Sequence, residues 1–152
     1  MKLLFIIKKK QTYGYVSHPS GMANNTRFTT HYLDMLKDVT SDTAYVNDNN
    51  DIDREVSLYK PDYVFIEALW VVPEKFIVLQ QLHPTVKWII RIHSKIPFLS
   101  IEGMAFDWMN QLRNKDLYPM VYLSSNNEET SDELEEIGYT NIYLPNLYAD
   151  LY

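Results

Sequence analysis

The sequence has no cysteine among its 152 residues, which excludes disulfide bonds, thiolate metal sites and a cysteine nucleophile. It also lacks long apolar runs. The first such run ends after Ile7 at three lysines, which is too short for a signal peptide, and no segment reaches the length of a membrane span. These absences predict a soluble protein in the reducing setting of the cytoplasm.

Positive charge is also scarce. The chain has 14 lysines and arginines against 20 aspartates and glutamates, and its formal net charge is −6. Because phosphate-binding surfaces depend on clustered cations, this balance makes nucleic acid an unlikely partner, although a local basic patch is compatible with it. The hydrophobic share of 46% is ordinary for a globular protein, and the length predicts one domain over residues 1–152.

Short apolar segments alternate with segments of helical periodicity. The predicted strands read KLLFII, TAYVN, DYVFIEAL, TVKWIIRI, PMVYLS and NIYLPN. The predicted helices cover residues 28–39 after a start near Asn24 to Thr26, then 52–59, 73–83, 106–112 and a last one that ends at Gly138. The last helix begins with the spacing of a capping box, from Ser125 to Glu128.

This alternation predicts an α/β fold. We expect a doubly wound, mostly parallel, six-stranded Rossmann-like sheet with helices on both faces. Its simplest strand order is 3-2-1-4-5-6.

Ligands of such sheets bind beyond the carboxyl ends of the strands, so the residues at these ends are candidates. The candidate ligand-binding residues are Gly14, Ser17, His18, Gly21 and Asn24 after the first strand, Trp70 after the third, Ser94 and Lys95 after the fourth, and Ser124 and Asn126 at the fifth. Imidazoles and cations at this edge point to an anionic or polyhydroxylated ligand. The first loop is long for its position, and such loops are usually functional or mobile.

His93 and Glu67 are the candidate catalytic residues. An imidazole near neutrality accepts a proton from a hydroxyl, and Glu67 or Ser94 could fix its tautomer. The alternatives are that His93 is a packing or hydrogen-bonding residue and that Glu67 faces outward. The four histidines show no metal-ligand spacing, which predicts no metal site, and the sequence contains no G-x-G-x-x-G, P-loop or G-x-S-x-G motif.

Four segments resemble the N-terminal, acceptor-side domain of glycosyltransferases with the GT-B fold. They are HPSGMANNTRFTTHYLDML, YKPDYVFIE, HPTVKWIIRIHS and VYLSSNNEETSDELEEIGYTNIYLPN. The resemblance implies a metal-independent transferase that moves a sugar from a nucleotide sugar, as donor substrate, to a sugar or glycan acceptor, with no cofactor. It implies that Gly21 approaches the donor phosphates and that His93 is an acceptor contact or base.

The second, donor-binding domain of that family is absent from this sequence. The resemblance therefore implies half an active site, completed by a second domain, a partner chain or a homo-oligomer. The alternative hypothesis is a non-catalytic Rossmann-like interaction module that binds a protein or carbohydrate partner.

Overall fold

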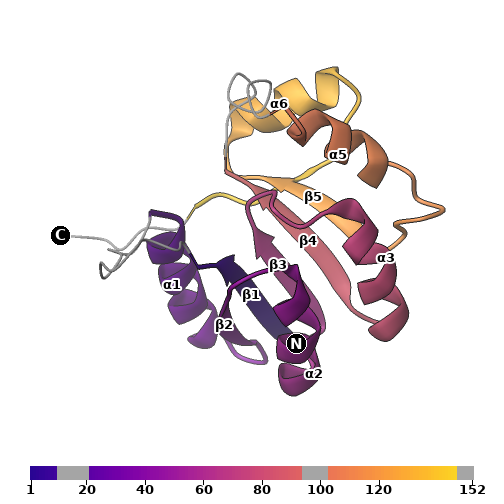
Figure 1. Ribbon diagram of the computed structural model, residues 1–152. Coiled ribbons are helices and arrows are strands. Elements are labelled where there is room, and N and C mark those ends of the chain that lie inside the picture. The colour runs from indigo at the N-terminus through magenta and orange to yellow at the C-terminus, as the bar shows by residue number, and fades with distance from the viewer. Residues whose placement is uncertain (10–20, 94–102, 147–152) are drawn as a thin grey trace, which may run out of the picture.

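The computed structural model describes residues 1–9, 21–93 and 103–146, and the side chains of residues 21–24 are outside the description. Six strands form one sheet, and every neighbouring pair is parallel (Figure 1). The strands are β1 (Lys2–Lys8), β2 (Thr40–Val46), β3 (Tyr63–Glu67), β4 (Lys87–Ile92), β5 (Val121–Ser125) and β6 (Ile142–Tyr143). The helices are α1 (Gly21–Asp34), the 3-10 helix η1 (Asn49–Asp51), α2 (Ile52–Tyr59), α3 (Pro73–Leu82), α5 (Ala105–Leu112) and α6 (Glu128–Glu136). The predicted fold class is confirmed.

The strand order differs from the prediction. It is β2-β1-β3-β4-β5-β6, the flavodoxin-like order extended by one strand, and the predicted order 3-2-1-4-5-6 is wrong. The reason lies in the two strands that compete for the edge. Strand β2 is polar and largely exposed, which suits an edge of the sheet. Both faces of β3 carry apolar side chains, which suits an interior strand.

The helices are distributed unequally over the two faces of the sheet. Helices α2, α3, α5 and α6 all contribute buried side chains to one apolar core. Helix α1 packs on the opposite face, where the Ser41 hydroxyl of β2 donates to the Thr30 carbonyl and to Asp34 Oδ1. This follows from right-handed crossovers, because the step from β1 to β2 runs in the opposite direction to the other steps.

The main core centres on Trp88 of β4. Its side chain is fully buried, and the Phe76 ring of α3 meets it edge to face, with centroids 6.0 Å apart and planes at 69°. On the opposite face the rings of Phe5 and Phe65 stack with centroids 4.6 Å apart. Both faces of the central strands are thus apolar, as a parallel sheet requires.

Helix α1 starts earlier and ends earlier than predicted. It begins at Gly21, so Asn25 and Thr26, expected at its start, are buried within it. It ends at Asp34, and Met35 and Leu36, counted as apolar helix positions, are 68% and 41% exposed. The apolar spacing continues past the end of the helix, but these two exposed side chains pack against no core.

The cap of α6 also differs from the prediction. Ser125 belongs to β5, and its hydroxyl bonds to Asn141 Oδ1 at 2.6 Å. The N-cap is Asn127, whose side chain accepts from the Thr130 amide at 3.1 Å. The predicted stop at Gly138 is confirmed, because this glycine has φ +96° directly after the last turn.

Replacing Phe76 by alanine removes the ring that contacts Trp88 and leaves a cavity in the main core. We expect Phe76→Ala to lower the free energy of unfolding by about 3–5 kcal/mol in urea denaturation. Val78 on the same helix is 45% exposed, and Val78→Ala serves as the matched control, with a change of about 0.5 kcal/mol or less. Equal losses in the two variants would contradict the described orientation of α3.

Candidate functional site

A buried ion pair joins the carboxyl ends of β3 and β4. Glu67 and Arg91 are register partners in the parallel ladder, so their side chains lie side by side on the same face. Arg91 Nη1 is 2.8 Å from Glu67 Oε1, and the two side chains are 3% and 0% exposed. A charge buried this deeply is tolerated because its opposite charge is buried beside it.

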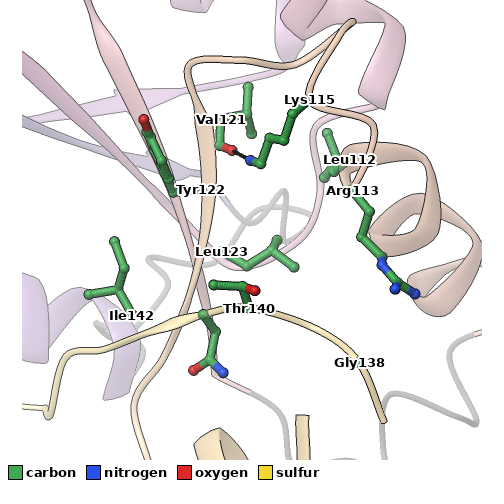
Figure 2. A pocket seen from close by; sticks show the side chains of 10 residues that line it. Leu112, Arg113, Lys115, Val121, Tyr122, Leu123, Gly138, Thr140 and Ile142 are labelled. Carbon is green, nitrogen blue, oxygen red and sulfur yellow. Dashed lines mark hydrogen bonds between the residues drawn. The ribbon is translucent and has the colours of Figure 1, made fainter. Parts of the chain in front are cut away.

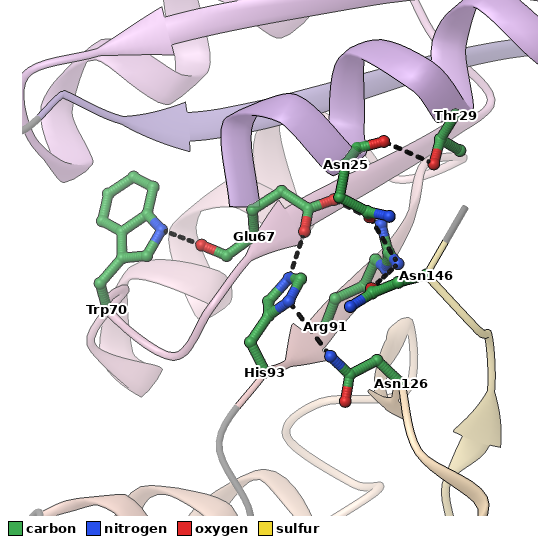
Figure 3. A network of polar contacts seen from close by, with 8 residues as sticks. All are labelled: Asn25, Thr29, Glu67, Trp70, Arg91, His93, Asn126 and Asn146. Carbon is green, nitrogen blue, oxygen red and sulfur yellow. Dashed lines mark hydrogen bonds and ion pairs between the residues drawn. The ribbon is translucent and has the colours of Figure 1, made fainter. Parts of the chain in front are cut away.

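His93 extends this pair towards the surface (Figure 3). Its Nε2 lies 2.6 Å from Glu67 Oε2, and its Nδ1 lies 3.4 Å from the side-chain nitrogen of Asn126. In the tautomer with its proton on Nε2, the imidazole donates to the carboxylate and accepts from the Asn126 amide at Nδ1. The side chain of His93 is 17% exposed, so the network reaches the surface through this imidazole.

Two asparagines from distant parts of the chain approach the inner end of the network. Arg91 Nη2 lies 3.5 Å from Asn25 Oδ1 on α1 and 3.3 Å from Asn146 Oδ1 after β6. Within the described residues, Arg91 Nε and the hydroxyl of Ser124, its register partner on β5, are buried without a hydrogen-bond partner. The site therefore keeps unused hydrogen-bonding capacity beneath His93.

Trp70 forms the rim beside Glu67. Ala68 takes a left-handed conformation, with φ +74°, directly after β3, and its amide still bonds to the Arg91 carbonyl at 2.9 Å. This sharp turn brings the chain back, so that the half-buried Trp70 donates from Nε1 to the Glu67 carbonyl at 2.9 Å. Lys8 Nζ lies 5.8 Å from the centre of the Trp70 ring. Alanine is uncommon in this region of backbone conformation, so the turn at Ala68 is strained.

The structure brings several predicted site residues together. Glu67, His93, Trp70, Asn126 and Ser124 all belong to the carboxyl ends of β3, β4 and β5 or to the turns that follow them. Glu67 turns inward, so the alternative that it faces outward is wrong. The catalytic and ligand-binding roles of these residues stay predictions.

Other predicted residues have a different placement. Gly21 begins α1 and Asn24 lies within the same helix. Gly14, Ser17, His18, Ser94 and Lys95 lie outside the described residues.

Arg91 is the central residue that sequence reasoning missed. It stands between Ile90 and Ile92 in a strand that is buried at five of six positions. A cation in such a strand signals a carboxylate partner on a neighbouring strand, and Glu67 at the end of the preceding apolar strand is the matching position.

In the part of the chain that the structure describes, no three histidine, aspartate or glutamate side chains come together as a metal-binding group. Over the same residues, no helix combines the length and the apolar character that crossing a membrane demands.

Comparison with known proteins assigns no family. No protein-family model matches the chain, and no curated protein matches it. Among solved structures, the chain is similar to a DNA-binding response regulator of the LuxR family from Staphylococcus aureus, with a TM-score of 0.43 and 14% identity over 89% of this chain and 94% of that chain. At this distance the likeness carries no function to the present chain.

The glycosyltransferase prediction is wrong. No glycosyltransferase is among the findings: no family model and no curated protein matches the chain, and the solved structure found by comparison is a response regulator. Transfer of a sugar from a nucleotide sugar therefore has no support. In their described residues, the four segments that carried the resemblance contain α1, β3, β4 and the run from β5 through α6 to β6, and strands and helices in this order are general to parallel α/β sheets.

Replacing Glu67 by glutamine leaves the Arg91 guanidinium buried without an opposite charge. We expect Glu67→Gln to lower the free energy of unfolding by about 3–5 kcal/mol in urea at neutral pH. Asp53→Asn is the control, because Asp53 also contacts a histidine, His83, at 2.6 Å but is 44% exposed. Its expected loss is about 1 kcal/mol or less, and a similar loss in both variants would refute the buried charge pair.

Proposed function

We propose that this chain is a non-catalytic binding module that holds a carbohydrate at the edge formed by the carboxyl ends of β3, β4 and β5. The observation that carries the proposal is the continuous hydrogen-bond chain from Arg91 through Glu67 and His93 to Asn126, with the Trp70 indole bonded to the Glu67 carbonyl. A cytoplasmic setting, inferred from the cysteine-free sequence, is part of the same proposal.

The bonding of Glu67 and His93 favours binding over catalysis. Both Glu67 carboxylate oxygens are already engaged, one by Arg91 and one by His93, and the side chain is 0% exposed. Both ring nitrogens of His93 have a partner as well. A general base needs a lone pair within reach of the substrate proton, whereas the Glu67 oxygens are buried and the Nδ1 atom of His93 already faces the Asn126 amide. Its role is to hold the imidazole and the amide in fixed positions.

The side chains at the rim suit a hydroxyl-rich ligand. An indole ring provides an apolar face for the C–H groups of a sugar ring, and its polar tip is fixed by the Glu67 carbonyl. The Asn126 amide has donors and an acceptor for sugar hydroxyls, and Lys8 adds a cation near the ring. A few placed polar groups around an aromatic surface are typical of small-molecule sites.

Carbohydrate binding is tested by titrating the protein with a panel of neutral and acidic mono- and oligosaccharides, read by nuclear magnetic resonance. We expect shifts of the Trp70 indole N–H, the His93 ring and the Asn126 amide. Trp70→Ala removes the stacking ring and weakens binding about tenfold, which corresponds to about 1.4 kcal/mol. Trp70→Phe keeps an aromatic face and most of the affinity.

Asn50→Ala is the matched control for Asn126→Ala, because Asn50 is an exposed asparagine in η1, after the edge strand β2. It leaves binding unchanged, whereas Asn126→Ala weakens it. Failure of every saccharide to bind, together with specific capture of a purified protein partner, would replace the carbohydrate by a protein. Turnover of a bound saccharide would overturn the non-catalytic assignment.

A further inference from the structure

A cavity lies along the outer side of β5, built from residues other than those of the carboxyl-edge network (Figure 2). It has a volume of about 370 Å³ and is formed by the end of α5, the strand β5 and the connection from α6 to β6. This size falls within the range of small-molecule sites.

The shortness of β6 creates this cavity. Strand β6 pairs with β5 only at Ser124 and Ser125, so the first half of β5 has no neighbouring strand on its outer side. The Lys115 ammonium donates to the Val121 carbonyl there, which satisfies one backbone group of this half-strand. The space between β5 and the α6–β6 connection is therefore not filled by a further strand, and side chains line it.

The inner wall of the cavity is apolar and the rim is cationic. Leu112 and Leu123, which line it, are 3% and 7% exposed and belong to the main core. The rim carries Arg113 and Lys115, and within the described residues neither has a carboxylate within ion-pair distance. Arg91, elsewhere in the molecule, is by contrast paired with the buried carboxylate of Glu67.

Aromatic rings hold both cations in place. The Arg113 guanidinium lies 4.8 Å from the centre of the Tyr139 ring, and Lys115 Nζ lies 4.9 Å from that of Tyr122. Gly138 leaves room for the guanidinium, because a Cβ at this position would come within 3.3 Å of Arg113 Nη2. Burial lowers the pKa of Lys115, so an anion placed beside it would regain electrostatic energy that the desolvated ammonium lacks.

We propose that this cavity is a site for a small organic anion with an apolar body, in which a carboxylate lies at the cationic rim while the apolar body covers Leu112 and Leu123. Two cations alone would suit any anion, but the apolar wall selects one that carries a hydrocarbon or aromatic group. The site is independent of the proposed carbohydrate edge, because the two share no residue.

The proposal is tested with 3-phenylpropionate, its neutral analogue 3-phenylpropanol and inorganic phosphate, each titrated into the full chain by nuclear magnetic resonance. We expect 3-phenylpropionate to shift the Leu123 and Thr140 amides. The alcohol, which lacks the charge, and phosphate, which lacks the apolar body, bind at least about tenfold more weakly, a difference of about 1.4 kcal/mol.

Arg113→Gln and Lys115→Gln each weaken binding of 3-phenylpropionate about fivefold or more, whereas Lys37→Gln, at an exposed lysine after α1, leaves it unchanged. A direct reading avoids any dependence on how well the variants fold. In the unaltered protein we expect the bound carboxylate to raise the pKa of Lys115. This pKa is measured from the pH dependence of the chemical shift of the Lys115 Cε–H group. Equal binding of the alcohol, equal binding of phosphate, or shifts confined to the Trp70 edge would overturn the proposal.

Discussion

The register between β3 and β4 fixes the edge of the sheet that carries the candidate site, and the Glu67–Arg91 ion pair enforces this register. A slip of one residue would turn Arg91 to the opposite face, into the apolar core around Trp88 and Phe76. Glu67 would remain behind without its cation. An unpaired charge in a protein interior costs several kcal/mol, so the slipped pairing is strongly disfavoured. Once the register is set, His93 follows Arg91 out of the sheet and meets the second oxygen of Glu67.

Local sequence pattern was enough to predict the elements and the fold class, because each element carries its own signal. Pro73 starts α3 at its first turn, and Gly138 takes the left-handed conformation that ends α6. The strand order was not predictable in the same way, since it depends on which strand tolerates the edge. The polarity of β2, with exposed Thr40 and Asp42, indicates an edge strand, whereas the order 3-2-1-4-5-6 places β3 at the edge. The cap of α6 shifted from Ser125 to Asn127 because Ser125 still pairs within β5.

The candidate site was predicted in part. Glu67, His93, Trp70 and Asn126 could be placed at one edge because parallel strands all end on the same side of a sheet. The role of Arg91 was not predicted, because a single cation inside an apolar strand indicates a buried ion pair only when its register partner, here Glu67, is known. The family resemblance failed for a related reason. Its motifs describe strand ends, helix starts and a closing Pro-Asn step, and these features belong to the architecture and fix no chemistry.

The full burial of Glu67 and Arg91 restricts how these two positions can change over evolutionary time. Loss of either Glu67 or Arg91 alone leaves the other as an unpaired charge in a medium of low dielectric constant. Replacement of both by well-packed apolar side chains removes both charges at once. Lysine is a poor replacement for Arg91, because its single ammonium cannot reproduce a planar fork that faces Glu67 with one nitrogen and Asn25 and Asn146 with another. Positions 67 and 91 are therefore epistatic, because the effect of a substitution at one depends on the residue at the other.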